Sequence, residues 1–464
     1  MLTTVWQKRL PGSSVGARLD SYLLMNLQND TLQEPAFLVG ADVRGSRPLL
    51  KLDDSLQELA LLAKTAGMLV VGQAQQHLHQ IDPNTFIGSG KAEEIRQAVM
   101  ETGAKVVVFD DELSPRHLRQ LEKLFGDDVR ILDRSALILD IFAQHARTRE
   151  GALQVELAQY EYRLPRLTRQ WTHLARQAGG GAARGGAAGV GLRGPGETQL
   201  EVDRRDIRRR IVRLKRELEQ IRHQRSQHRQ QRSRAGMPVI ALVGYTNAGK
   251  STLLQAISGA EVYIADQLFA TLDPLSRRIE LPSHRQAIMT DTVGFIQKLP
   301  TTLIAAFRAT LEEVAEADLL LHVVDAAHPN VLQHIETVED TLAAIDVPPL
   351  PRILVWNKLD LCPDLDVLQR RSGDDYHAEV AVSARTGMNL PELLSAVESV
   401  LALRLRQVRL LFPYERGDLV AAVYELGTVI ERETTPSGIV LTASLSASLF
   451  ERFKDFQIGN VENV

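Results

Sequence analysis

Residues 238–254 read PVIALVGYTNAGKSTLL, and this stretch decides the fold. An apolar run over residues 239–243 predicts a buried strand, which is followed by Gly244-x-x-x-x-Gly249-Lys250-Ser251 and by the apolar start of a helix. The backbone N–H groups of such a loop, together with the N-terminus of the next helix, can hold the negative charges of a polyphosphate. The two glycines let the backbone approach a ligand closely, Lys250 supplies a positive charge between the outer phosphates, and the Ser251 hydroxyl can ligate Mg²⁺. The stretch therefore predicts a nucleotide-binding loop rather than an ordinary glycine turn.

Two later motifs follow in the order that a nucleotide hydrolase requires. Thr271, in the stretch FATLDP, lies between the helix after the glycine loop and the next strand, where a threonine can complete the Mg²⁺ ligands when a γ-phosphate is present. Asp291-Thr292-Val293-Gly294 follows an apolar strand, so that Asp291 can reach Mg²⁺ through water and the Gly294 N–H can contact the γ-phosphate.

A third motif, Asn357-Lys358-Leu359-Asp360, points to the base of the nucleotide. The Asp360 carboxylate can accept hydrogen bonds from guanine N1 and N2, while the stem of Lys358 packs on the base. Ser383-Ala384, after the last strand, can offer a backbone N–H to guanine O6. Adenine has the opposite donor pattern and would leave a buried Asp360 unpaired. The motif therefore predicts GTP rather than ATP.

Composition bounds the class of protein. The 464 residues allow about three domains, and 44% apolar with 24% charged residues is ordinary for a globular chain. Since Cys362 is the only cysteine, no intrachain disulfide can form. The N-terminus lacks the apolar core of a signal peptide, and no run approaches the roughly 18 apolar residues of a membrane helix. We therefore expect a soluble cytoplasmic protein, and we expect it to be a monomer.

The net charge of −4 conceals an uneven distribution. Residues 163–236 contain 19 Lys and Arg against 6 Asp and Glu, which gives this segment +13 and leaves −17 for the rest of the chain. A basic middle between acidic flanks favours a polyanion partner such as nucleic acid. On charge alone, a solvated helix face explains the segment equally well.

Periodicity predicts an α/β chain with several domains. Residues 1–35 have little pattern, and residues 36–145 alternate predicted strands (36–43, 68–75, 105–109 and 129–132) with predicted helices (55–66, 92–102 and 115–124), which is typical of a small parallel α/β domain. Within it, Ile87-Gly88-Ser89-Gly90-Lys91 precedes a helix, and this segment is either a phosphate or RNA-backbone site or an ordinary helix start. Residues 237–405 add predicted strands (277–281, 287–290, 319–325, 353–356 and 379–382) and helices (303–315 and 391–403) to the glycine loop. They predict a doubly wound, mostly parallel sheet with the nucleotide at the carboxyl ends of its strands, followed by a small α+β domain over residues 406–464.

Residues 146–236 predict an antiparallel helical hairpin. Apolar residues step by four and three in two heptad seams, one of Leu153, Leu157, Tyr160, Leu164, Leu167, Trp171 and Leu174, the other of Leu200, Ile207, Ile211, Leu214, Leu218 and Ile221. Pro165 is expected to kink the first helix, a glycine-rich loop over residues 179–196 joins the two, and residues 220–236 are expected to form a basic linker. Arginines crowd the positions of the second helix outside its seam, namely Arg204, Arg205, Arg208, Arg209, Arg210 and Arg213.

From about residue 36 to the C-terminal tail the chain resembles the HflX-type GTPases, of the Obg–HflX group in the TRAFAC class. The resemblance rests on GYTNAGKST (244–252), FATLDP (269–274), DTVGF (291–295), GPGETQLE (194–201) and IFAQHARTREGALQVELAQ (141–159). It implies a P-loop GTPase that uses Mg²⁺, associates with the large ribosomal subunit and its rRNA, hydrolyses GTP there, and splits stalled or idle ribosomes.

The motifs and the resemblance together give the expected site. We expect the nucleotide to contact Gly244, Tyr245, Thr246, Asn247, Ala248, Gly249, Lys250, Ser251, Thr252, Phe269, Thr271, Asp291, Gly294, Asn357, Lys358, Asp360, Ser383 and Ala384. We expect Lys250, Thr271 and Gly294 to act in catalysis, and the metal to be held by Ser251, Thr271 and Asp291.

Two positions qualify this expectation. Phe295 stands where Ras-type GTPases place a glutamine that orients the attacking water, and a phenyl ring has no donor or acceptor for that task. Asn247 matches a residue that binds K⁺ in some related GTPases, and it serves equally well as a loop-stabilising asparagine.

We therefore expect a Mg²⁺-dependent GTPase that acts on ribosomes. Two other functions stay open at this point: an N-terminal domain that remodels RNA with ATP, and a signalling-type GTPase switch with a protein effector.

Overall fold

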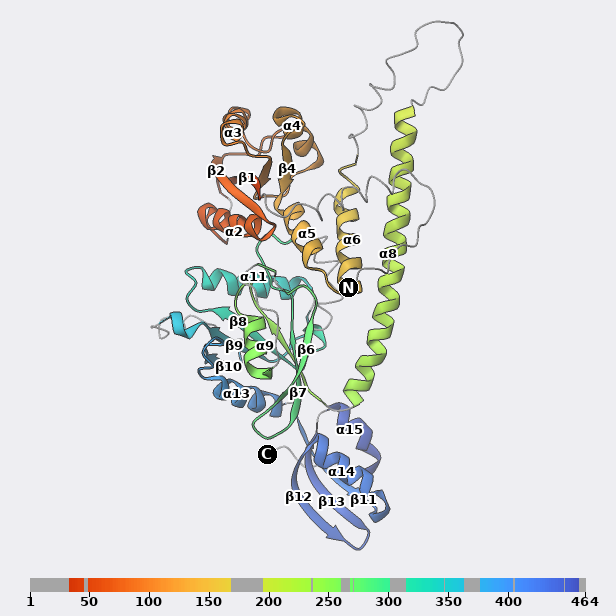
Figure 1. The fold of residues 1–464 in the computed structure, drawn as a ribbon. Coiled ribbons are helices and arrows are strands. Elements are labelled where there is room, and N and C mark those ends of the chain that lie inside the picture. The colour runs from red at the N-terminus through yellow and green to blue at the C-terminus, as the bar shows by residue number, and fades with distance from the viewer. Residues whose placement is uncertain are drawn as a thin grey trace, which may run out of the picture.

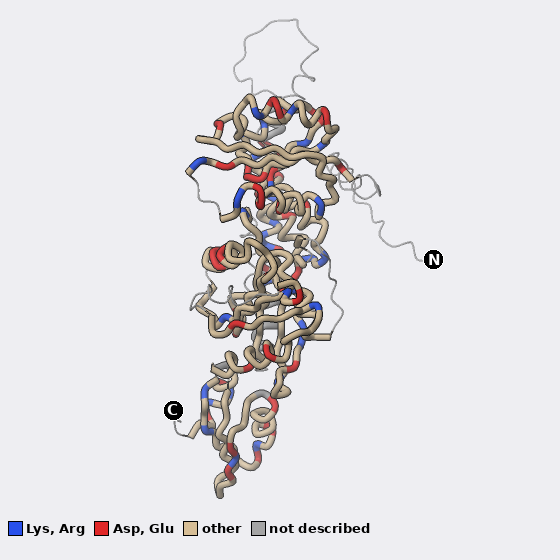
Figure 2. The backbone as a smooth tube through the Cα atoms, turned by 90° about the vertical axis from the view of Figure 1, so that its left-hand side faces the viewer, with Lys and Arg blue, Asp and Glu red and all other residues tan. Residues whose placement is uncertain are grey.

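The computed structural model describes residues 33–45, 49–167, 195–234, 237–259, 268–269, 271–300, 314–345, 347–362, 376–403, 405–445 and 447–458. These residues form three sheets and a pair of long helices, arranged end to end in an elongated molecule with the first and last sheets at opposite ends (Figures 1 and 2). The fold is α/β, as the alternation of strands and helices predicts. The first 32 residues and residues 168–194, which include most of the glycine-rich loop between the two predicted hairpin helices, lie outside the described part of the chain.

The N-terminal sheet is entirely parallel. In sheet order its strands are β2 (Met68–Leu78), β1 (Glu34–Val43), β3 (Val106–Phe109) and β4 (Arg130–Asp133). Its helices are α2 (Leu52–Thr65), α3 (Ser89–Thr102), α4 (Pro115–Phe125) and α5 (Arg134–His145). Successive β1 side chains alternate between two cores: Leu38 packs with α2 and α5, whereas Phe37 packs with α3 and α4.

The predicted strands and helices of this unit are confirmed to within a few residues, but α5 is absent from the prediction. Its apolar residues lie on several sides of the helix, since Leu137, Ile138, Leu139, Ile141 and Phe142 are all buried. A helix that is apolar around most of its circumference has no clear amphipathic period to detect.

The helical pair consists of α6 (Arg149–Arg163) and α8 (Pro195–Arg234), which run in opposite directions (Figure 1). Their contact is built from seam residues that the sequence predicts, with Leu157, Leu214 and Leu218 buried and Leu153, Tyr160 and Ile211 half-buried. The expected kink at Pro165 does not appear, because α6 already ends at Arg163 and a turn follows.

The predicted linker over residues 220–236 is wrong for most of its length. The α8 helix continues to Arg234 and ends beside α15 (Ala447–Phe453), as Figure 1 shows. Arg and Gln, which fill this stretch, are good helix formers, and no Gly or Pro interrupts them before Gly236. Polar composition alone therefore does not mark a linker.

Within the described residues the central sheet has six strands, of which only β6 is antiparallel to its neighbour. In sheet order the strands are β10 (Ala378–Ala381), β9 (Arg352–Asn357), β8 (Leu319–Asp325), β5 (Val239–Val243), β7 (Gln286–Asp291) and β6 (Leu275–Glu280). Helices α9 (Lys250–Ser258), α11 (Val331–Ala344) and α13 (Leu390–Ala402) pack on this sheet. The predicted helix over residues 303–315 falls almost wholly outside the described residues. The doubly wound, mostly parallel sheet is thus confirmed.

The C-terminal unit is a small antiparallel α+β fold. Its strands are β11 (Arg406–Phe412), β13 (Gly438–Leu445) and β12 (Thr428–Thr435) in sheet order, covered by α14 (Gly417–Leu426) and α15. Among the helices that the structure describes, none combines the length and the apolarity that crossing a membrane demands.

Candidate nucleotide-binding site

The glycine loop connects β5 to α9, at the carboxyl end of the central strand. Gly244 has φ of 154°, and a Cβ added there would overlap the carbonyl oxygen of Val323 in β8. Gly249 has φ of 92°, and a Cβ there would overlap the Asn357 side chain. Both glycines are therefore required by backbone conformation and by close approach to neighbouring strands.

Lys250 lies beneath this loop. Its ammonium donates to the carbonyl oxygens of Gly244 (3.1 Å) and Tyr245 (2.8 Å). Burial lowers the pKa of Lys250 to about 8, and the nearby Asp291 carboxylate opposes the shift. A Cβ added at Gly294 would lie 3.2 Å from the Lys250 Nζ, which brings the predicted γ-phosphate contacts together as expected.

The three predicted metal ligands also converge. The Ser251 Oγ lies 2.8 Å from the Thr271 Oγ1 and 2.6 Å from an Asp291 carboxylate oxygen. The other Asp291 oxygen is buried with no hydrogen-bond partner within the described residues, and burial raises the pKa of this carboxyl group. One carboxylate and two hydroxyls are the hard oxygen donors that Mg²⁺ prefers, and a buried carboxylate oxygen that lacks a donor fits a cation better than a neutral group. The residues present therefore fit Mg²⁺.

The predicted base-binding residues meet at the ends of β9 and β10. Asn357 donates to the Ala248 carbonyl (2.8 Å) and accepts from the Ala384 N–H (3.0 Å), which ties the base-binding segments to the phosphate loop. The Ser383 hydroxyl donates to Asp360 (2.6 Å), and Lys358 donates to Asp325 (2.7 Å). The Ser383 contact holds one oxygen of the exposed Asp360 carboxylate beside the base-binding segments.

The other residues predicted to contact the nucleotide differ in the burial of their side chains. Thr246 and Ala248 are buried in the loop, Asn247 is exposed with φ of 60°, and Thr252 is half-buried in α9. The rings of Tyr245 and Phe269 are buried 96% and 98% against other parts of the chain, which leaves their backbone groups for a nucleotide.

Asp360→Asn is expected to weaken GTP binding and improve binding of xanthosine triphosphate, because one acceptor of the carboxylate becomes a donor. The preference should move by at least about tenfold, or roughly 1.4 kcal/mol. Competition between the two nucleotides for the variant measures it. If the preference does not move, the base is bound elsewhere.

Phe295 occupies the position after the DTVG motif, and its ring is 3% exposed within the core that joins the central and N-terminal units. Its backbone N–H donates to the Gly244 carbonyl (3.1 Å) and its carbonyl accepts from the Thr246 N–H (2.7 Å). Both the side chain and the backbone of Phe295 are thus committed to packing and to a bridge with the glycine loop, and neither is available to orient water.

The sequence analysis missed a buried polar network beside the loop. The Tyr245 hydroxyl donates to Glu58 of α2, and Arg134 of α5 pairs with Glu58 (2.7 Å) and with Asp110 after β3 (2.9 Å). Lys298, four residues beyond Gly294, also pairs with Asp110 (2.6 Å). Figure 2 shows acidic segments gathered where the N-terminal sheet meets the central unit. No local sequence motif predicts these contacts, because they join segments that are far apart in the chain.

Residues 87–91 form the start of α3, with Gly88 at its N-cap. The Gly88 N–H donates to the Gln76 side chain (3.0 Å) and Lys91 pairs with Glu94 on its own helix (2.7 Å). The Gly88 N–H and the Lys91 ammonium, which could otherwise bind a phosphate, thus have partners within the protein.

Comparison with known proteins extends these observations. Three family models match: a GTP-binding GTPase N-terminal region over residues 53–143, a GTP-binding GTPase middle region over residues 145–232, and a 50S ribosome-binding GTPase over residues 239–358. Among solved structures, a GTP-binding protein from Sulfolobus solfataricus in complex with GDP is 22% identical, with a TM-score of 0.42 over 80% of this chain and 99% of that chain.

Curated relatives match over nearly the whole length. The GTPase HflX of Caldanaerobacter subterraneus subsp. tengcongensis is 45% identical over 88% of this chain and 91% of its own. The GTPase HflX of Escherichia coli K12 is 47% identical over 82% of this chain and 86% of its own. With the guanine motif, the phosphate loop and the predicted metal ligands brought together in one site, and with 45–47% identity to these relatives over more than four fifths of its length, the chain belongs to the HflX family of GTPases.

Proposed function

We propose that this chain acts in the cytoplasm as a monomer that binds the large ribosomal subunit, hydrolyses GTP there with Mg²⁺, and so separates stalled or idle ribosomes. The observation that supports catalysis is the convergence of Lys250, Gly294 and the three oxygen ligands at the carboxyl ends of β5 and β7.

Six of the predicted site residues then have a task in GTP binding and hydrolysis. Lys250 and the Gly294 N–H stabilise charge on the outer phosphates, and Asp360 selects guanine. Ser251, Thr271 and Asp291 would hold Mg²⁺, which supplies charge neutralisation at the phosphates when bound. Because Phe295 is committed to packing, we infer that the ribosome supplies or places the group that orients the attacking water.

Asn247 would hold a K⁺ ion beside the phosphates. Its exposed side chain at the rim of the loop supports this proposal. Its φ of 60° lies in the left-handed region, which asparagine adopts readily.

The ribosome-binding surface that we propose is the outer face of α8. Arg205, Arg208 and Arg209 are exposed there and Arg204 is half-buried, whereas Arg210 pairs with Glu156 of α6 (2.8 Å) and Arg213 with Glu217 (2.8 Å). Arg209 also forms a long surface pair with Asp206 of its own helix (3.4 Å). The first four arginines are therefore suited to meet RNA phosphates, while Arg210 joins α8 to α6 and Arg213 pairs within α8. The match of residues 239–358 to the 50S ribosome-binding GTPase model also supports this partner.

Replacing Arg204, Arg205, Arg208 and Arg209 together by Gln is expected to weaken binding to large subunits and to flatten its salt dependence, because each lost phosphate contact removes about one released counterion. Co-sedimentation of the full chain with large subunits over a range of salt concentrations measures both quantities. GTP binding to the free protein should hardly change, since these side chains lie on α8 and not at the glycine loop.

The matched control replaces four exposed basic residues scattered over other elements, namely Lys64, Lys123, Arg278 and Arg385. This variant carries the same change in net charge and should keep most of the affinity. Equal affinity and equal salt slope for the α8 variant and the wild type would make the arginines a solvated helix face.

A further inference from the structure

Helix α5 lies between the two loops that carry the predicted γ-phosphate contacts. Its first residue, Arg134, donates to the carbonyl of Gln297 (3.1 Å), three residues beyond Gly294. Just past its last residue, the backbone N–H groups of Arg147 and Thr148 donate to Asp273 (3.0 and 2.8 Å), two residues beyond Thr271. Helix α5 and the short turn after it thus contact both loops, and this turn leads directly into α6.

The Asp273 carboxylate accepts its hydrogen bonds at the N-terminal end of α6. Besides the two backbone donors it accepts the Thr148 hydroxyl, and that hydroxyl in turn caps α6 by accepting the Gly151 N–H (3.0 Å). A Cβ added at Gly151 would overlap an Asp273 oxygen, so a glycine is needed for the carboxylate to come this close. A carboxylate at a helix N-terminus also meets the positive end of the helix dipole.

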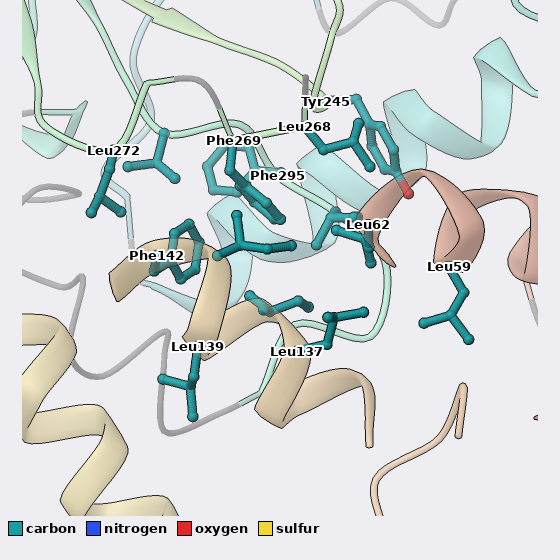
Figure 3. Packing of buried hydrophobic residues seen from close by; sticks show 14 of the residues in the cluster. Leu59, Leu62, Leu137, Leu139, Phe142, Tyr245, Leu268, Phe269, Leu272 and Phe295 are labelled. Atoms are coloured by element: carbon teal, nitrogen blue, oxygen red, sulfur yellow. The ribbon is translucent and has the colours of Figure 1, made fainter. Parts of the chain in front are cut away.

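Apolar packing runs alongside this polar contact. The centroids of the Phe269 ring and the Phe142 ring of α5 lie 4.6 Å apart, and Leu272 is buried in the same core (Figure 3). Phe295, from the other loop, belongs to this core as well, so side chains of α5 are shared between the loops (Figure 3). Thr271 therefore lies between residues that are held in two ways. Phe269 and Leu272 pack in the apolar core, and Asp273 is held by hydrogen bonds to its carboxylate.

The position of the Thr271 side chain is restricted from two directions. The next residue, Leu272, is buried, and the Thr271 hydroxyl contacts Ser251. This hydroxyl lies 2.8 Å from Ser251 at the metal ligands, in the same structure in which Asp273 is seated on α6. Since the two residues are separated only by the buried Leu272, fixing Asp273 restricts where the Thr271 hydroxyl can lie.

We propose that Asp273 is a positioning residue for Thr271, and that its seat on the Arg147–Thr148 backbone and the Thr148 hydroxyl couples the γ-phosphate end of the nucleotide site to helix α6. We call this contact the Asp273 latch. The coupling is reciprocal: a ligand that draws Thr271 onto the metal favours the latch, and a partner that favours the latch strengthens binding of that ligand.

The Asp273 latch gives a physical reason for the residue types in one stretch on which the family resemblance rests. Residues 141–159 contain Phe142, which packs on Phe269, and also Thr148 and Gly151, which receive Asp273. These residue types are needed because a loop of the central unit docks there.

Asp273→Ala and Thr148→Val are expected to weaken binding of a non-hydrolysable GTP analogue with Mg²⁺ about fivefold to tenfold, and to leave GDP within about twofold, since a charge-assisted contact near the γ-phosphate is lost. Titration of the full chain with fluorescent nucleotides measures both affinities. Thr148→Ser keeps the hydroxyl and should restore the analogue affinity. Since Thr148→Val removes one of the three donors whose acceptor is lost in Asp273→Ala, the double variant should lose little more than Asp273→Ala alone.

The matched control is Ser114→Ala, which removes the hydroxyl that caps α4 by accepting the His117 N–H (3.2 Å), away from either loop. This variant is expected to lower thermal stability as Thr148→Val does, while the ratio of analogue to GDP affinity stays at the wild-type value. Equal losses for analogue and GDP in the Asp273 variant, or no loss at all, would overturn the latch.

The part of the inference that concerns α6 rests on the proposed ribosome function and has its own readout. Asp273→Ala should reduce the acceleration of GTP turnover by large subunits at least about tenfold, while its co-sedimentation in GDP stays unchanged. If wild-type turnover does not respond to large subunits, the proposed function fails, and the nucleotide titrations still decide whether the latch exists.

Discussion

Large ribosomal subunits are expected to raise the GTP turnover of this chain on the order of 10³-fold, from the 10⁻⁴ to 10⁻² s⁻¹ that is typical of unassisted GTPases. The physical reason is Phe295, whose ring is buried and whose backbone groups bond to the glycine loop, so the free protein has no group at this position to orient water. Phosphate release under multiple-turnover conditions, with and without purified subunits, measures the effect. Phe295→Gln is not expected to replace the subunits, because the side chain would enter a packed core rather than face the nucleotide.

Two controls belong to this assay. Lys250→Ala should abolish GTP turnover both with and without subunits, and ATP hydrolysis that survives it would point to a second site in the N-terminal unit. Replacing K⁺ by Na⁺ should slow hydrolysis if Asn247 holds K⁺, and Asn247→Ala should then remove the difference between the two ions. Fast turnover of the free protein would contradict the assignment of the water-orienting group to the ribosome.

Arg134→Met is expected to reduce the free energy of unfolding of the N-terminal unit by about 3–5 kcal/mol, the cost of leaving the Glu58 carboxylate without its cation and Asp110 with Lys298 alone. Arg134 is 1% exposed and pairs with Glu58 and with Asp110, and the Asp110 side chain is fully buried. Chemical denaturation followed by a probe within residues 36–145 measures the change. Arg130→Met is the matched control, because its pair with Glu34 has both side chains 43% exposed, and such a surface pair is worth about 0–1 kcal/mol.

The same network sets the direction of a pH effect. Burial alone would raise the pKa of Asp110, but Arg134 and Lys298 hold it below its ordinary value. A carboxyl group with a depressed pKa in the folded state stabilises the fold above its unfolded pKa of about 3.9 and loses that contribution as the pH falls through the folded pKa. The wild type should therefore keep this contribution at neutral pH and lose it only in acid. An Arg134→Met variant that unfolds like the wild type at neutral pH would show that the network does not stabilise the fold.

The sequence by itself determined the nucleotide site, because the information for it is local. Gly244 and Gly249 are required by the conformation of their own loop, and the spacing from Gly249 to Lys250 and Ser251 places both functional side chains on the first turn of one helix. Apolar runs predict the strands, and the regular order of the strands brings Asp291 and Asn357 to the same edge of the sheet. The heptad seams likewise predict the pairing of α6 with α8, since a period of 3.5 residues leaves one apolar face to cover.

Only the tertiary structure decided what surrounds that site. In the sequence, no pattern singles out Arg134, Tyr245 is expected only to contact the nucleotide, and Asp273 occurs only as a member of the stretch FATLDP. Their roles come from partners far away, since Tyr245 meets Glu58 across 187 positions of the chain and Asp273 meets Thr148 across 125. Helix α5, which makes these contacts possible, has no amphipathic period, because neighbours cover it on several sides. Local patterns report the conformation of a segment and the face that it buries, whereas the partner that a polar side chain finds depends on which distant segments the fold brings beside it.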